Sequence, residues 1–430
     1  MNIAAELASR SLALILGLTL FLAVTTSLMR TVIVPRPLLS LYTDAVRTII
    51  ISVVRAIART QRTFAGRDAV LAWIGPLLIL GLLIAWLAGY LVAYGFILYG
   101  VGEKGLGDAM RESGSSLLTL GFAGSNTENQ TVIDFIAAAT GPIVIAMLIG
   151  FLPTIYQAYI DREISVTMLA TEAGEPAWGP ELLSRSTLSG ALGELDQLFD
   201  RWTLWAASTR LTHTTYPMLL HVRSPRAGRH FTVALLAVMD AAALNVSLTS
   251  TPPRRDSYRL LLEGTQSFNL LYIHFFAKHP RRTRIPFVGR FLGGRQPSLS
   301  HPMTLPAWKE EILAVHEAAA QDSAAGMPRS GVLALSAGED QPLHITRADF
   351  DRAVDVLTRS GFPIERGLDE AWAMFQEARS RYEFPAYAIM RQLDAAPAPW
   401  TGDRRVKTPT MWPSLAVDHL PNGQQGPLNG

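Results

Sequence analysis

Three long apolar runs occupy much of the first 160 residues of the chain. Residues 11–29 and 69–99 contain no charged residue, and residues 132–160 contain one, Asp134. A helix of about 20 apolar residues is long enough to cross a hydrocarbon core of about 30 Å. The pattern therefore predicts three transmembrane helices, an N-terminal helix within residues 1–33 and two further helices over residues 69–99 and 132–160.

The first apolar run also has features of a secretory signal peptide, because it is N-terminal and follows a short polar stretch. Its uncharged run, between Arg10 and Arg30, is longer than the apolar region of a typical signal peptide, and no small-residue cleavage site follows it. We therefore expect a retained helix over residues 1–33.

Arginine dominates the connection between the first two predicted spans. Residues 34–68 contain two acids, Asp44 and Asp68, and the arginines Arg36, Arg47, Arg55, Arg59, Arg62 and Arg67. An excess of arginine marks the cytoplasmic side, and the apolar face of this segment favours a helix that lies along the membrane surface. A fourth span over residues 38–57 is the alternative, and it would bury Asp44 and Arg47 in the hydrocarbon core.

Placing residues 34–68 in the cytoplasm orients the whole chain. The N-terminus and residues 100–131 then lie outside, and everything after residue 160 lies in the cytoplasm. We therefore expect a multi-pass protein of the inner (plasma) membrane in which residues 161–395 form a cytoplasmic domain.

The outer connection contains a helix that is too short to span. Residues 106–118 have a half-apolar helical pattern of about three turns, and the Thr/Gly-containing residues 119–124 that follow favour no helix. Non-helical backbone at membrane depth is tolerated only where protein buries it or where it lines a water-filled path. The pattern predicts a re-entrant pore loop with a pore helix over residues 106–118.

This arrangement resembles the pore module of the potassium channel superfamily, which has an outer helix, a pore helix, a filter and an inner helix. The resemblance covers residues 69–160, and "TLGF" at residues 119–122 matches the first four positions of the family's Thr-Val-Gly-Tyr-Gly filter with two conservative changes. Several stretches, among them "SGSSLLTLGFAG" and "DFDRAVDVLTRSGFPIERGLDEAWAMFQEAR", are also similar to a poorly characterised group of bacterial proteins regarded as ion channels. The resemblance implies a permeating monovalent cation, K⁺, and a homotetramer, because one chain supplies one pore loop.

In such a filter, backbone carbonyls replace the oxygens that an ion loses when it leaves water. Thr119 would add a hydroxyl at the cytoplasmic mouth, Gly121 would relieve unusual backbone torsions, and Phe122 would pack outward against the pore helix. The predicted filter residues are Thr119, Leu120, Gly121, Phe122, Ala123 and Gly124.

Ala123 departs from the family pattern, which has glycine at this position. A residue with a Cβ resists positive φ, and the usual acid after the second glycine is absent unless Gly124 is a shifted glycine. A potassium-selective filter and a less selective cation pathway both stay open.

The predicted inner helix over residues 132–160 contains candidate gating positions. Gly141 and Gly150 are hinge candidates, and Pro153 should kink the helix, although glycine and proline also serve packing in membrane helices. Glu128 and Asp134 lie at the predicted outer mouth, where they would attract cations or stay solvated.

Helical spacing recurs through the cytoplasmic region. Apolar residues repeat at about 3.6 positions in residues 182–209, 231–248, 258–277, 307–320, 347–360 and 368–393. Residues 233–248 are apolar enough to resemble a span, but they contain Asp240 and Asn245, so we expect a core helix. The composition of residues 396–430 predicts a disordered tail.

Composition and spacing argue against several kinds of site. The chain has no cysteine, which excludes disulfides and thiolate ligands, and its net charge of +2 comes without a basic patch interleaved with aromatics, so nucleic acid is not expected. His213 and His221 are eight positions apart, but core or surface roles are favoured over metal binding. We expect no enzyme, no cofactor, and no metal beyond permeating cations.

These patterns predict an all-α membrane protein with three transmembrane helices, a re-entrant pore loop and an all-helical cytoplasmic domain. The expected function is that of a potassium-channel-like cation channel subunit that conducts ions passively. The alternative is a non-conducting membrane sensor or scaffold that keeps the pore fold and acts through its cytoplasmic domain. The sequence does not identify the gating stimulus or the cytoplasmic ligand.

Overall fold

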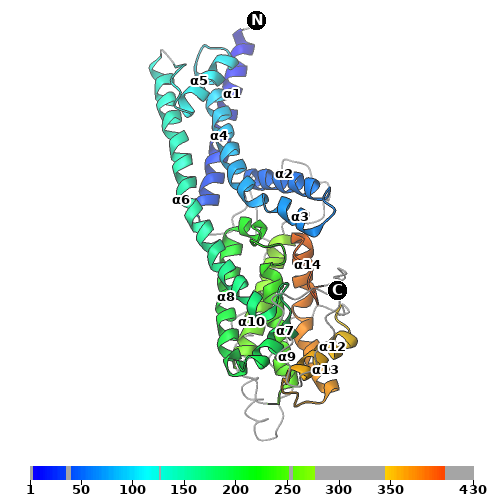
Figure 1. The fold of residues 1–430 in the computed structure, drawn as a ribbon. Helices are drawn as coiled ribbons and strands as arrows, with labels where there is room; N and C mark the ends of the chain where they lie inside the picture. Colours follow the sequence, from blue (N-terminus) through cyan, green and yellow to red (C-terminus); the bar gives the residue numbers. More distant parts are fainter. Residues whose placement is uncertain (1–2, 35–39, 125–126, 251–254, 277–343, 402–430) are drawn as a thin grey trace, which may run out of the picture. The chain divides into compact units, whose positions relative to one another are not determined.

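All regular structure in the described part of the chain is helical (Figure 1). The structure is a computed structural model, and the residues it describes are 3–34, 40–124, 127–250, 255–276 and 344–401. Within these residues there is no strand, which confirms the predicted all-α class. The chain forms two compact units, which are considered separately.

The first unit comprises Met1–Ala170, Ser208–Phe231 and Leu393–Ala396. Its main elements are α1 (Ile3–Val32), α2 (Leu41–Ala58), α3 (Phe64–Leu71), α4 (Ile74–Val101), α5 (Leu106–Leu117), α6 (Glu128–Ala173, of which the last residues belong to the second unit) and the short η2 (Pro217–His221). The predicted helices within residues 1–33 and over residues 106–118 are confirmed to within a few residues.

Three predicted helix boundaries in this unit were wrong. The surface helix expected over residues 34–68 is two helices, because the Thr63 hydroxyl accepts a hydrogen bond from Gly66 N at 3.1 Å and caps the start of a new helix, α3. The outer helix begins at Ile74 rather than at residue 69, after a turn that separates it from α3. The inner helix continues beyond residue 160 to Ala173, because its later apolar residues are also buried.

α1 and α4 pack closely through small residues and a terminal cap. A Cβ on Gly17 of α1 would lie 2.8 Å from the Ala93 carbonyl oxygen of α4, so only glycine permits this approach. At the other end of the pair, Arg10 donates a hydrogen bond to the Tyr99 carbonyl at 3.0 Å and another to the Gly102 carbonyl. These contacts satisfy carbonyls that the end of α4 would otherwise leave unpaired.

Four described segments are long and apolar enough to cross a membrane, namely Glu6–Val32, Phe64–Val101, Glu128–Ala173 and Phe231–Leu248. The chain itself buries 28%, 33% and 22% of the most apolar window in the first three, but 94% in the fourth. Long apolar helices thus indicate a membrane protein, as predicted. The fourth segment differs from the others because its apolar surface is already covered by protein.

The second unit comprises Thr171–Ala207, Thr232–Gln392 and Pro397–Gly430, and α9 lies in its core. Its elements are α7 (Gly179–Leu188), η1 (Leu192–Glu194), α8 (Leu195–Thr215), α9 (Phe231–Leu248), α10 (Arg255–Phe276), α12 (Arg347–Ser360), α13 (Leu368–Ser380) and α14 (Glu383–Leu393). The second part of α8, the first residue of α9 and the last residue of α14 belong to the first unit. Gly179 allows α7 to approach α9, because a Cβ there would lie 2.8 Å from the Ala237 carbonyl oxygen.

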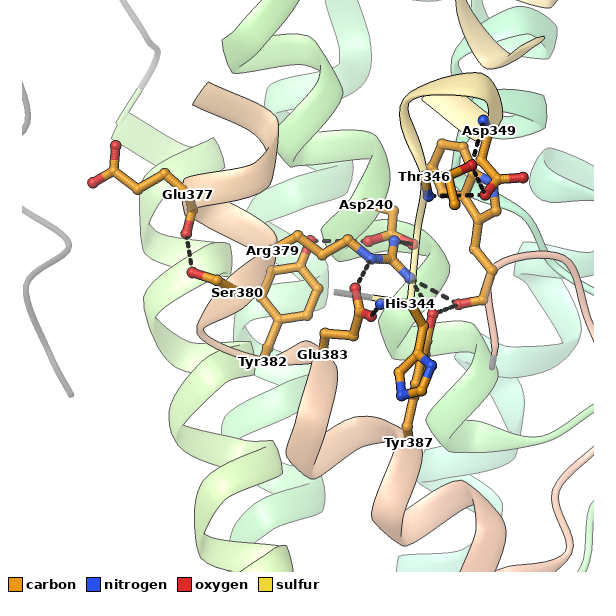
Figure 2. Close-up of polar contacts among 11 residues, drawn as sticks. Asp240, His344, Thr346, Asp349, Glu377, Arg379, Ser380, Tyr382, Glu383 and Tyr387 are labelled. Carbon is orange, nitrogen blue, oxygen red and sulfur yellow. Dashed lines mark hydrogen bonds and ion pairs between the residues drawn. The ribbon is translucent and has the colours of Figure 1, made fainter. Parts of the chain in front are cut away.

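A buried ion-pair network ties α9 to α13 and α14 (Figure 2). Arg379 pairs with Asp240 of α9 and with Glu383 at 2.7 Å, and it donates a hydrogen bond to the Trp400 carbonyl at 2.7 Å. Burial alone would lower the pKa of Arg379, but Asp240, Tyr387 and Glu383 hold that pKa well above its ordinary value. The one acid of α9 is therefore paired inside the unit, as a core helix requires.

The domain boundaries expected for the cytoplasmic region need correction. Residues 208–231 group with the first unit, so the predicted 161–395 domain is not one continuous block. Residues 397–401 belong to the second unit, and Trp400 packs on Trp178 with ring centroids 5.6 Å apart, so the predicted tail from residue 396 begins too early. Residues 402–430 lie outside the described residues.

Two of the long helices expected in this region are interrupted. The stretch 182–209 is divided among α7, η1 and α8, because Gly190 adopts φ 72° and ends the first of these. The stretch 368–393 is divided into α13 and α14. The helices at 231–248 and 347–360 are confirmed, whereas the one predicted at 307–320 lies outside the described residues.

Candidate functional site

The candidate site is the hairpin that consists of α5 and residues 118–124, between α4 and α6 (Figure 1). Ser113 of α5 donates a hydrogen bond to the Leu91 carbonyl of α4 at 2.7 Å. Leu91 precedes the end of α4 by about ten residues, or roughly 15 Å of helix. On the other side, Gly141 of α6 lies so close to the Leu117 carbonyl that a Cβ would overlap it. The C-terminal end of α5 thus lies deep alongside both long helices.

The backbone turns sharply where α5 ends. Thr119 has φ 55° and Gly121 has φ 73°, so two alternate residues adopt the left-handed region. The positive φ at Gly121 fits the predicted need for glycine there, whereas that at Thr119 was not foreseen. Ala123 is outside the positive-φ region, so its Cβ causes no backbone strain.

Hydrogen bonds from the last turn of α5 hold this segment. Leu120 N donates to the Ser115 carbonyl at 2.8 Å, and Ala123 N donates to the Ser115 hydroxyl at 2.9 Å. Ser115 itself is fully buried. One serine therefore ties both the start and the end of the turn to the helix.

The outward side of the hairpin is apolar and is not covered by the residues that the structure describes. Leu120 is 60% exposed and Phe122 is 54% exposed. The predicted contact of Phe122 with the pore helix is present, because the Arg111 guanidinium lies 5.4 Å from the centre of its ring. Clusters of exposed large apolar side chains are typical of surfaces that contact protein, ligand or membrane.

A lysine that the sequence reasoning missed fixes the far end of the segment. Lys104 Nζ lies 2.6 Å from the Glu112 carboxylate and donates a hydrogen bond to the Gly124 carbonyl at 2.9 Å. Glu112 is buried within α5. The sequence signal for this pair is weak, because α5 contains a second acid, Asp108, besides Glu112.

The two predicted outer-mouth acids behave differently. Asp134 accepts a hydrogen bond from the Ser116 hydroxyl at 2.7 Å, so it attaches α6 to the end of α5. Glu128, at the first position of α6, is exposed. Of the pair, Glu128 is the one whose carboxylate is open to solvent.

The three gating candidates of the inner helix also separate. Gly141 is a close-packing position against Leu117, whereas nothing lies within 4 Å of a Cβ built on Gly150. α6 continues as one helix through both Pro142 and Pro153.

A buried arginine in the C-terminal half of α6 attaches this helix to a segment more than fifty residues further along the chain. Arg162 donates hydrogen bonds to the Leu219 carbonyl at 3.0 Å and to the Val222 carbonyl at 2.8 Å, and its guanidinium lies 3.0 Å from His213 Nε2. His213 Nδ1 lies 2.8 Å from the Thr209 carbonyl. Burial and the Arg162 charge lower the pKa of His213 well below its ordinary value, so the ring is neutral and accepts from Arg162.

His221 lies in a second basic environment of the first unit. Burial lowers its pKa to about 3, with further contributions from Arg55, Arg47 and Arg223. Arg223 in turn pairs with Asp68 at 3.3 Å. The two histidines singled out in the sequence are therefore neutral core residues, in line with the structural roles favoured for them.

Among the described residues, no group of three or more His, Cys, Asp and Glu side chains could hold a metal ion. No protein-family model matches the chain, and neither a curated protein nor a solved structure was found to match it.

Proposed function

We propose that the chain is one subunit of a potassium-channel-like cation channel, in which residues 119–124 of four copies surround a common axis. The observation that carries the proposal is the hairpin itself, a short helix that lies deep between two long apolar helices and is followed by a hydrogen-bonded turn with an exposed outward side. In this account the hairpin is re-entrant, α1, α4 and α6 are the three spans, and α9 is a core helix of the cytoplasmic domain. The N-terminus lies outside.

The geometry supports an ion pathway in two ways. The C-terminal end of α5 carries the negative end of a helix dipole, which favours a cation nearby. Backbone carbonyls that follow it would replace water oxygens around a cation once several copies form a ring. The apolar exposure of Leu120 and Phe122 fits the same arrangement, because neighbouring copies would cover these side chains.

Potassium and other monovalent cations are both compatible with this site. The lack of backbone strain at Ala123 removes one objection to the filter. A non-conducting sensor or scaffold with the same pore fold is the alternative function, and no contact of the described residues favours it over conduction.

Cation flux from the purified protein in liposomes tests the proposal. Wild type should pass K⁺, and Gly121→Ala should reduce the flux by at least about tenfold, because alanine disfavours φ 73° by roughly 1–2 kcal/mol at each of four positions. Gly107→Ala is the matched control, since Gly107 lies on the same hairpin with open space around a Cβ and no positive φ. Absence of flux in wild type over a range of voltage, pH and divalent-ion concentration would contradict the proposal.

A further inference from the structure

The outward side of α2 is uncharged along its whole length. Its exposed positions recur every three or four residues and form one stripe, which we call the α2 face: Leu41, Ala45, Thr48, Ile49, Ser52, Val53, Ala56 and Ile57. Four of these, Leu41, Ile49, Val53 and Ile57, are more than half exposed. An apolar stripe of this length on a charged helix is typical of a helix that lies in a membrane interface.

The charges of α2 point away from that face. Arg47 pairs with Asp44 at 3.1 Å, and its side chain is only 18% exposed. Arg55 is largely buried beside Arg223 and Asp394 of the first unit. The helix therefore keeps its internal charges against protein and leaves an apolar side uncovered by the described residues.

Contacts with α1 and α4 fix where α2 lies. Ser40, just before α2, donates a hydrogen bond to the Ser27 hydroxyl of α1 at 2.9 Å, and the Tyr42 hydroxyl donates to the Ala85 carbonyl of α4. Ser27 lies one turn before Arg30, where the uncharged run of α1 ends. Figure 1 shows α2 running across the direction of α1. If α1 crosses the bilayer, α2 lies at its cytoplasmic boundary.

The C-terminal end of α2 adds positive charge at this boundary. Arg59 and Arg62 are exposed, and neither forms an ion pair with a residue that the structure describes. Residues 59–67 contain no acid, and Arg67 is already paired with Asp394 at 3.3 Å. Trp73, 63% exposed, follows α3 and is suited to the headgroup level. Guanidinium groups bind phosphate oxygens well, and basic residues at the cytoplasmic surface attract anionic lipid.

We propose that the α2 face together with Arg59 and Arg62 is a binding surface for anionic phospholipid, in which the apolar stripe contacts acyl chains and the two arginines bind headgroup phosphates. The inference rests on the membrane placement in the proposed function, but not on ion conduction.

The absence of cysteine allows a direct test on the full-length chain. An environment-sensitive fluorophore is attached to Ile57→Cys, and the protein is reconstituted in vesicles of phosphatidylcholine with about 30% phosphatidylglycerol. Two vesicle samples are compared, which contain the same mole fraction of a nitroxide quencher attached to an acyl chain. In one sample the labelled lipid is phosphatidylglycerol, and in the other it is phosphatidylcholine. Leu22→Cys on α1, also exposed, is the control position.

Quenching at position 57 should be about twofold stronger with labelled phosphatidylglycerol, whereas position 22 should show no preference. The preference should disappear in Arg59→Gln with Arg62→Gln and persist in the corresponding double lysine variant. Equal quenching by both lipids at position 57 would overturn the anionic preference. No quenching by either would overturn the surface itself, since another copy or another part of the chain would then cover it. This readout does not depend on ion flux. A protein that showed the twofold preference but passed no ions would therefore contradict the proposed channel function and leave the lipid-binding surface intact.

Discussion

α6 and α9 are both apolar enough to cross a membrane, yet the chain buries 22% of the apolar window of one and 94% of the other. α9 lies in a helical core and pairs its one acid, Asp240, with Arg379. α6 exposes large apolar side chains along much of its length, among them Phe135, Ile149 and Tyr156. The comparison teaches that hydropathy measures how much apolar surface needs cover, not what covers it. For α9 the cover is protein, and for α6 we propose lipid and further copies of the chain.

The largest expected effect comes from breaking the protein cover of α9. Arg379→Met would leave Asp240 and Glu383 as buried, unpaired acids, and removal of one partner from such a network costs about 3–5 kcal/mol. Thermal unfolding of the purified protein should shift down strongly, with loss of the second unit. Arg352→Met is the control, because the side chain of Arg352 is 72% exposed in its pair with Asp349. A surface pair contributes about 0–1 kcal/mol, so equal shifts for both variants would mean that the network is not essential.

A matched pair of leucines tests what covers the two regions. Leu22 of α1 and Leu204 of α8 are 63% and 62% exposed. If α1 faces hydrocarbon, Leu22→Arg should cost about 2.5–3.5 kcal/mol and lower the amount of protein in the membrane fraction. Leu204→Arg, facing water, should change stability by less than about 0.5 kcal/mol. Similar tolerance at both positions would argue against a membrane around α1.

The close packing at Gly141 gives the next effect. Gly141→Ala places a Cβ against the Leu117 carbonyl and should cost up to about 3 kcal/mol, with loss of flux because the end of α5 must move. Gly150→Ala on the same helix has open space around its Cβ and should be neutral or slightly stabilising. Thermal unfolding and ion flux, measured for both variants, distinguish the two positions. If Gly150→Ala were the variant that abolished flux at full stability, Gly150 would be the hinge.

The smallest effect depends on pH. His221 has a folded pKa of about 3 against 6.5 unfolded, so it stays neutral in the fold while the unfolded chain takes up a proton. The stability that depends on a neutral His221 is fully present above about pH 7 and is lost progressively as pH falls from about 6.5 toward 3. At pH 5 the loss amounts to about 2 kcal/mol of the free energy of unfolding. Between pH 7.5 and pH 5, thermal stability should fall less in His221→Gln than in wild type. Parallel pH profiles would show that His221 does not titrate in this range.

Local pattern predicted much of the hairpin, because helix length, a Thr/Gly segment and the position between two spans are visible in the chain itself. The positive φ of Gly121 follows from the same reasoning. Thr119 could not be foreseen, since threonine rarely adopts positive φ, and it does so here while the turn is hydrogen-bonded to Ser115. The pair of Lys104 and Glu112 was missed because Lys104 lies in the turn before α5, where no periodic pattern links the two residues.

Long-range contacts account for most of what the sequence could not predict. Arg162 and His213 are about fifty residues apart, and no periodic pattern links them. The same holds for the grouping of residues 208–231 with the first unit and for Trp400, which packs in the second unit although its neighbours have the composition of a tail. Asp240, in contrast, was informative, because an acid in an apolar run, together with Asn245, indicated a core helix rather than a span.

Flux through a protein with a single cysteine at position 119 tests the central claim most directly. The native chain has no cysteine, so a charged methanethiosulfonate reagent would react only with Thr119→Cys. We expect this variant to pass K⁺, the reagent to stop the flux, and a reducing agent to restore it. Thr60→Cys, exposed at the end of α2, should react without loss of flux. Unchanged flux through Thr119→Cys whose modification mass spectrometry has verified would contradict the account, because ions would then pass elsewhere.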